Sequence, residues 1–203
     1  MRSVVGKKVQ TLLQDIQACK HCGDLKGNTP FIYAGPESRL MIVSHVPHKG
    51  SFEENYGKTW AEGMIDKGTP RALFKWLDLD FEEAKRIIFW IQRMNCALDK
   101  SNGLDIAIRD CSTMFIPRAI KAVQPKLIVS IGRPAAEWFF GGSFTLLTEL
   151  VGKRMEYVFE GRKIPFIAFP HPSGANRRWI SENGHLLDKA KLLVREQLQG
   201  KTG

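Results

Sequence analysis

Every cysteine of the 203-residue chain falls into one pattern that is typical of metal ligands. Cys19 and Cys22 are separated by two residues, and Cys96 and Cys111 follow much further along the chain. A close pair of thiols can reach one metal centre from a single turn, and thiolates are soft ligands suited to zinc or to an iron–sulfur cluster. A four-thiolate zinc site would more often show two close pairs. Buried free cysteines or two disulfides would also account for the spacing.

A second group of reactive side chains lies between His171 and Trp179. It combines an imidazole, a hydroxyl, two guanidinium groups and an indole around a glycine. Hydroxyl and guanidinium groups bind phosphate, and an indole can stack on bases or wedge between them. We therefore expect DNA or RNA contacts from the polar and aromatic members of this segment: Ser173, Arg177, Arg178 and Trp179. An exposed turn whose indole packs on the edge of the sheet would have the same composition.

The net charge of the chain agrees with a polyanionic partner. Thirty Lys and Arg against 21 Asp and Glu give a formal charge of +9, and phosphate contacts made by such side chains release counterions. No segment resembles a signal peptide or is apolar enough to span a bilayer. We therefore expect a protein without membrane association in the cytoplasm, where thiols stay reduced and available to metal.

The elements that must position these groups alternate between helix and strand. Apolar periodicity and helix-start signals predict helices over residues 4–17, 70–77, 104–123 and 134–140 and a final helix that ends near 199, with Pro117 kinking the third. Continuous apolar runs predict buried strands over residues 40–43, 87–91 and 127–131, and a hairpin of 155–160 and 163–169 around Gly161 and Arg162.

Strands that are apolar on both faces and separated by helices indicate an α/β fold with a mostly parallel sheet between two helical layers. The length and ordinary composition predict a single domain over residues 1–203. Ligands of open α/β sheets bind beyond the carboxyl ends of the strands. Three polar loops are expected there, at residues 44–48, 92–96 and 171–179.

Three segments, taken together with the cysteines, resemble the uracil-DNA glycosylase superfamily and within it the iron–sulfur family usually called family 4. These segments are LMIVSHVPH, where that family has an apolar strand running into a GEAPG-like motif, IGRPAAEWFFG after the third buried strand, and FPHPS at the second motif. The resemblance covers most of the chain. It implies a three-layer α/β/α sandwich around a central, mostly parallel four-stranded sheet. It also implies a 4Fe-4S cluster that braces the DNA-contacting surface, held by Cys19, Cys22, Cys96 and Cys111.

The resemblance implies a monofunctional DNA glycosylase, which flips a damaged or modified base out of DNA and hydrolyses its N-glycosidic bond. His171 matches the histidine of the second motif, whose donor stabilises the departing base. DNA is then the partner, and we expect a monomer without an obligate protein partner. A prokaryotic or phage-related, nucleoid-associated protein fits this activity.

The first motif departs from the family pattern at the position that usually activates water. His45 stands where relatives carry Glu, and His48 stands where they carry a final Gly. A neutral imidazole can accept a proton from water, which makes His45 the second catalytic candidate. Glu53 and Glu54 follow shortly afterwards and are alternative carboxylates.

The base pocket departs from the pattern as well. Gln92 aligns with the base-reading Asn of the family, while Asn95 is in another register, and Trp60 aligns with the aromatic on which the base stacks. Trp60 could equally serve the core. With Val46 as a third base-binding candidate, the longer amide and larger ring predict a base other than plain uracil, such as hypoxanthine or a modified pyrimidine of bacteriophage DNA.

Two further functions fit the same residues. The missing carboxylate favours a catalytically weak or inactive binder of damaged or foreign DNA, and the complete second motif argues against it. The third hypothesis is a zinc-braced nucleic-acid module without a base pocket. The positions of Trp60 and His171 at strand ends argue against this hypothesis.

Overall fold

The computed structural model describes residues 6–22, 31–46, 68–96, 104–142 and 144–200. Within these ranges the chain forms one six-stranded sheet in the order β1-β3-β2-β4-β6-β5. Its strands are β1 Tyr33–Ala34, β2 Leu40–Ser44, β3 Ile88–Gln92, β4 Leu127–Ile131, β5 Met155–Phe159 and β6 Arg162–Phe169.

The four central strands, β3, β2, β4 and β6, are parallel neighbours, and the two outer strands pair antiparallel with them. Leu40 of β2 lies opposite both Ile88 and Leu127, so the three middle strands start at the same level. All residues of β2, β3 and β4 are buried, which is why their sequences are apolar runs without alternation. The predicted parallel sheet is confirmed, and β1 and β5 extend it at both edges.

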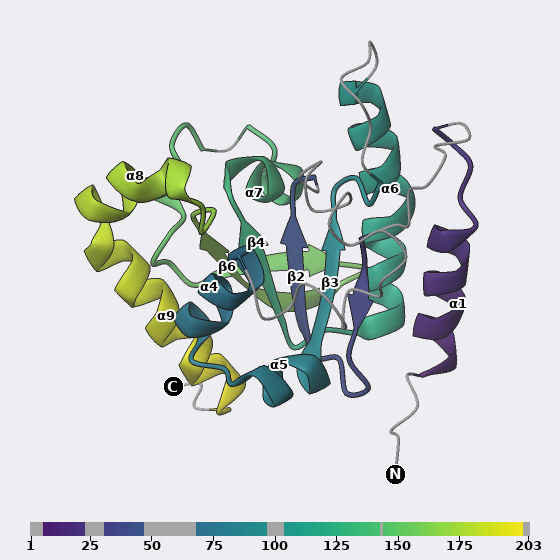
Figure 1. Ribbon diagram of the computed structural model, residues 1–203, viewed down its shortest axis with the longest axis horizontal. Coiled ribbons are helices and arrows are strands. Elements are labelled where there is room, and N and C mark those ends of the chain that lie inside the picture. The colour runs from purple at the N-terminus through teal and green to yellow at the C-terminus, as the bar shows by residue number, and fades with distance from the viewer. Residues whose placement is uncertain (1–5, 23–30, 47–67, 97–103, 143, 201–203) are drawn as a thin grey trace.

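Helices cover both faces of this sheet, as Figure 1 shows, with α1 beside α6 and α4 beside α9. The helices are α1 Lys7–Gln17, α4 Gly68–Leu77, α5 Phe81–Ile87, α6 Leu104–Val123, α7 Arg133–Phe140, α8 Arg177–Glu182 and α9 Gly184–Leu198. Two short 3-10 turns, Leu147–Glu149 and Gly174–Asn176, precede β5 and α8. No helix among the described residues is long and apolar enough to cross a membrane.

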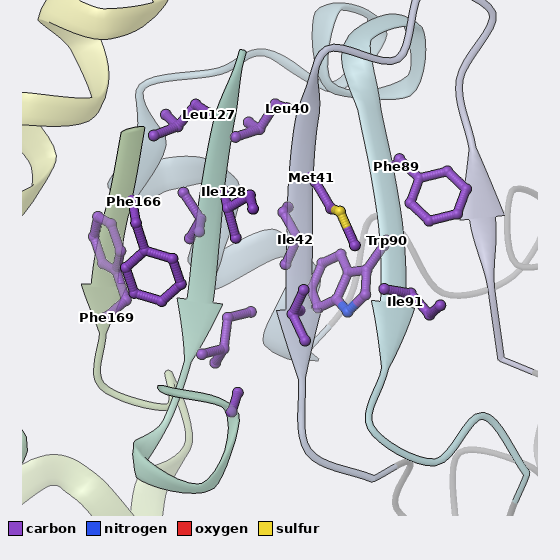
Figure 2. Close-up of a cluster of buried hydrophobic side chains, with 14 of the residues drawn as sticks. Leu40, Met41, Ile42, Phe89, Trp90, Ile91, Leu127, Ile128, Phe166 and Phe169 are labelled. Carbon is purple, nitrogen blue, oxygen red and sulfur yellow. The ribbon is translucent and has the colours of Figure 1, made fainter. Parts of the chain in front are cut away.

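Ring contacts show which helix covers which face. Trp76 of α4 stacks on Phe169 of β6 with 6.2 Å between ring centroids, whereas Phe139 of α7 meets Phe166 of β6 at 4.9 Å. Phe166 and Phe169 are three residues apart on one strand, so their side chains point to opposite faces. The helices α4 and α7 therefore lie in different layers, with the apolar side chains of the parallel strands between them (Figure 2).

The order of the strands places a topological switch point at β2. The chain leaves β2 through α4 and α5 to reach β3 on one side, and then crosses through α6 to β4 on the other side. Parallel crossovers are right-handed, so these two connections run over opposite faces of the sheet. Neighbouring loops therefore diverge at the carboxyl end of β2, and such switch points are where open α/β sheets bind ligands.

Three short elements were not predicted, and one turn is shifted. The hairpin turn consists of Glu160 and Gly161, with φ of 47° and 78°, because β6 already starts at Arg162 opposite Phe159. Positive φ at both central residues is the twist that suits a two-residue hairpin. The helices α5 and α8 and the strand β1 lie in segments for which no element was expected. Pro117 lies inside α6, which continues to Val123.

Candidate active site at the carboxyl ends of the parallel strands

Each of the four parallel strands delivers a residue to the same edge of the sheet. His45 directly follows β2, Gln92 is the last residue of β3, Gly132 follows β4, and His171 comes two residues after β6. Parallel strands end at one edge, so side chains far apart in the sequence meet there. The sequence-based grouping of His45, Gln92 and His171 at strand ends agrees with this placement.

The ends of β2 and β3 stay joined beyond the regular strands. The backbone N–H of Arg93 donates to the Ser44 carbonyl at 2.9 Å, and the N–H of Met94 donates to the His45 carbonyl at 3.2 Å. The indole of Trp90 donates to the Ser44 hydroxyl at 2.9 Å. These bonds hold the backbone of the segments that carry His45, Gln92 and Arg93.

Four buried polar atoms without a hydrogen-bond partner belong to residues at or near the carboxyl ends of β2, β3 and β4. They are the only such side-chain atoms in the described part of the chain: Nδ1 of His45, Oε1 of Gln92, Nε of Arg93 and Oγ of Ser130. A buried polar atom without a partner typically costs about 1–3 kcal/mol, so an isolated protein rarely concentrates them in one place. The arrangement suits a polar ligand that completes these hydrogen bonds.

Burial favours the neutral form of both histidines. Burial lowers the pKa of His45 below its ordinary 6.5, and the positive charge of Arg93 lowers it further, against the opposing effects of Asp105 and Glu137. The proximity of His171 also lowers the pKa of His45, which places both imidazoles in one electrostatic environment. Burial lowers the pKa of His171 as well. Each neutral ring carries one donor and one acceptor nitrogen.

Gly132 follows β4, which lies between β2 and β6, the strands that precede His45 and His171. Its φ of 79° is a conformation that suits glycine, and its N–H donates to the Phe169 carbonyl at 2.8 Å. A Cβ at this position would lie 3.7 Å from Cβ of His171. The turn after His171 is held by its own carbonyl, which accepts from Ser173 N at 2.9 Å and from Asn176 Nδ2 at 2.8 Å.

The predicted DNA-contacting segment is partly helical rather than a loop. Arg177, Arg178 and Trp179 form the first half of α8. The Arg178 side chain is 90% exposed and pairs with Glu182 at 2.7 Å. Arg177 is also exposed, whereas Trp179 is half-buried against the core. The two guanidinium groups are accessible to a phosphate backbone, and the indole is only partly so.

Val46, the remaining described base-binding candidate, follows His45 and is half-buried against the core. Two polar residues of this edge were missed at the level of the sequence. Arg93 adjoins Gln92 and Ser130 lies within β4. Their positions could have identified both residues in the sequence, because Ser130 is near the end of a parallel strand and Arg93 directly follows one. Trp60, His48, Glu53 and Glu54 lie outside the described residues.

The four cysteines come from three parts of the fold and influence one another. Burial raises the pKa of Cys96 to about 12, with further contributions from Cys111, Cys19 and Cys22. Burial also raises the pKa of Cys22 and of Cys111. Within the described ranges no three acidic, histidine or cysteine side chains are arranged as a metal site. The four thiols, which influence one another's pKa, nevertheless have the donor chemistry that an iron–sulfur cluster requires.

Asn95 connects the thiols to the strand edge. Its Oδ1 accepts from the Gln92 N–H at 3.0 Å, and its Nδ2 donates to Sγ of Cys111 at 3.6 Å. Its carbonyl accepts from Phe31 N at 2.7 Å. The amide of Asn95 therefore supports the end of β3 and does not compete with Gln92 for a ligand.

Comparisons with known proteins agree with this arrangement. The model of the uracil DNA glycosylase superfamily matches residues 31–194, which include every strand and the histidine-bearing edge. A protein of Sulfurisphaera tokodaii described as a type-4 uracil-DNA glycosylase is 22% identical over 174 residues, which cover 82% of this chain and 75% of that protein.

Proposed function

Because this chain belongs to the uracil DNA glycosylase superfamily, we propose that it hydrolyses the N-glycosidic bond of a base other than plain uracil in DNA. It is a DNA glycosylase, and DNA is its substrate. The observation that carries the finer proposal is the set of unpartnered polar atoms at the strand edge, which come from residues that differ from the family pattern at His45 and Gln92.

The reaction needs a donor for the departing base and a route for the proton of water. The C1′–N bond breaks with its electron pair passing to the base, and water adds to C1′ as the sugar gains oxocarbenium character. In our proposal a ring N–H of His171 donates to the base and offsets its developing negative charge. His45, neutral and with an unpartnered Nδ1, accepts the proton that water loses.

Gln92 supports an altered base pocket. Its side chain is 3% exposed and its Oε1 has no partner within the described structure, so it can read the edge of a flipped base. An amide that is one methylene longer than Asn reaches further into the pocket and shifts the hydrogen bonds that a base must satisfy. A base that leaves buried polar groups unpaired is rejected, which redirects the specificity.

The cysteines support an iron–sulfur cluster held by Cys19, Cys22, Cys96 and Cys111. Such a group would supply a structural brace between the end of α1, the end of β3 and α6, since these are the elements that carry the thiols. At the segment that follows β6, Ser173, Arg177 and Arg178 would bind the DNA backbone, with Trp179 next to them in the sequence.

The test is a panel of duplexes, each with one modified base, incubated under single-turnover conditions and treated with alkali to cut abasic sites. The panel contains uracil, hypoxanthine and modified pyrimidines of phage DNA, and His171→Ala is the matched inactive control. We expect at least one base to be released faster than uracil. Faster release of uracil than of every other base, with no effect of Gln92→Asn, would contradict the altered pocket. Binding to a damaged duplex without release of any base would identify a binder instead.

A further inference from the structure

We propose that Asn95 is a positioning residue for the iron–sulfur cluster, whose amide donates to the sulfur of the ligand Cys111 and slows the loss of iron. This inference rests on the cluster of the proposed function. It goes beyond that function because it assigns a role toward the cluster to a residue that is not a ligand. The hydrogen bonds of one buried amide carry it.

The side chain of Asn95 is buried, and its two polar atoms bond to different parts of the fold. Oδ1 accepts from the backbone N–H of Gln92 at 3.0 Å, and Nδ2 donates to Sγ of Cys111 at 3.6 Å. Only 1% of Asn95 is exposed. The backbone N–H of Gln92 can only donate, so it fixes the amide oxygen on that side and leaves the NH₂ group facing the sulfur.

The amide donor favours the form of Cys111 that binds metal. Burial raises the pKa of Cys111, whereas hydrogen bonds from the backbone and the side chain of Asn95 lower it. A thiol is a weak acceptor, and a charged acceptor forms a stronger hydrogen bond with the same donor. Because metal ligation requires the thiolate, the contact stabilises the ligating state of this cysteine.

Asn95 also joins three segments that surround the thiols. Its carbonyl accepts from Phe31 N at 2.7 Å, in the segment before β1. Its side chain connects the end of β3 to Cys111 of α6, and it directly precedes Cys96 in the sequence. A change at Asn95 therefore acts on two of the four ligands, one through a hydrogen bond and one through the chain.

The next residue of α6 bonds to the same part of the chain without touching a sulfur. Ser112 is fully buried, and its hydroxyl donates to the Arg93 carbonyl at 2.9 Å and to the Ile108 carbonyl of its own helix at 2.5 Å. Cys111 and Ser112 thus both link α6 to residues that follow β3. Loss of the Ser112 hydroxyl weakens this link but removes no donor to a ligand, so Ser112→Ala is a matched control for Asn95.

The experiment compares the full-length wild type, Asn95→Asp, Asn95→Leu and Ser112→Ala, all purified without oxygen. Aspartate keeps an acceptor for the Gln92 N–H but lacks the amide donor, and leucine of similar volume lacks both groups. Iron and sulfide content, the visible absorption of bound iron, the rate of iron release to a chelator and the melting temperature are measured for each protein.

We expect both Asn95 variants to release iron about tenfold to 100-fold faster than wild type, the loss typical when the hydrogen-bond partner of a metal ligand is removed. Their visible absorption should also shift. Ser112→Ala should keep the wild-type absorption and release iron within about threefold of the wild-type rate, even where its melting temperature falls, because it removes no bond to a ligand.

Three results would overturn the proposal. Equal acceleration in Ser112→Ala would assign Asn95 to the packing of α6, and wild-type release by Asn95→Asp would show that the donor has no effect on the ligand. A folded wild type without iron would overturn both this role and the cluster. Release of a base by that same iron-free protein would leave the glycosylase activity of the proposed function intact.

Discussion

The pKa of His45 reflects burial and four charged or titratable groups from different elements. Burial and Arg93 at the end of β3 lower its pKa most, Asp105 of α6 and Glu137 of α7 raise it, and His171 beyond β6 lowers it slightly. The balance lies below the ordinary value of 6.5. The water-activating role proposed for this imidazole would therefore be available at neutral pH and be lost in acid.

The single-turnover rate should be constant above about pH 6.5 and fall as the pH drops below it, because protonated imidazole cannot accept a proton. His45→Ala should lower the rate and remove this inflection. His185→Ala, which changes an exposed histidine at the start of α9, should keep the wild-type profile. The same acid limb in His45→Ala would assign the titration to another group.

In the proposed mechanism His171 acts on the departing base and not on duplex binding. His171 is partly buried and its Cβ lies near Gly132, whereas Arg177 and Arg178 of α8 are exposed. His171→Ala should lower the single-turnover rate by roughly 10²–10³, as for loss of one donor to a developing anion, with unchanged affinity for DNA. His171→Gln, which retains an N–H donor, should recover part of the rate. Parallel loss of affinity would show that His171 contributes to binding instead.

The residues that the sequence identified at this edge share one property, which is their place after an apolar run. The strands that end at or before His45, Gln92 and His171 lack alternation of apolar and polar residues, which is typical of a buried parallel sheet. The three residues could therefore be expected at the same edge. Arg93 and Ser130 were missed because what singles them out is the absence of a partner. Hydrogen-bond satisfaction depends on neighbours that the fold brings together, and no spacing within the chain encodes it.

At the scale of elements, α8 presents two arginines from one short helix. Arg178 already pairs with Glu182, so a phosphate contact must compete with that pair, while Arg177 has no ion pair within the described part of the chain. Arg177→Ala should therefore weaken DNA affinity more than Arg178→Ala. Each should reduce the dependence of log affinity on log salt by about one.

Fluorescence titrations at several salt concentrations measure this effect. Arg195→Ala is the control, because Arg195 of α9 pairs with Asp78 at 2.8 Å and carries the same charge. An identical change in slope for Arg195→Ala would mean that net charge, and not α8, governs binding.

Long elements were predictable and short ones were not. The 20 residues of α6 and the buried runs of β2 and β4 repeat their pattern often enough to be recognised. The helix α5 has seven residues and α8 has six, which is less than two helical turns. The helix α8 follows Pro172, Ser173 and Gly174, which are typical of turns, so local composition pointed to a loop.

At the scale of the whole molecule, the proposed cluster would tie the amino-terminal helix to the sheet through its four cysteines. Cys19 and Cys22 follow α1, Cys96 follows β3, and Cys111 lies within α6. Protein purified without oxygen should be brown and contain iron and sulfide. Cys22→Ser and Cys96→Ser should lose the colour and lower the melting temperature, since the brace is broken. One zinc and no iron would identify a different metal, and unchanged melting would exclude a structural role.

Both edges of the sheet are formed by antiparallel strands, and the four strands that bear the site are enclosed between them. Opening fluctuations start where backbone hydrogen bonds are few, and β1 has only two residues. Amide protons of β2 and β4 should therefore exchange with deuterated water last, close to the rate set by global unfolding, and those of β1 early. In the proposed reaction the base would then be read from the part of the sheet that opens last, while the outer strands open first.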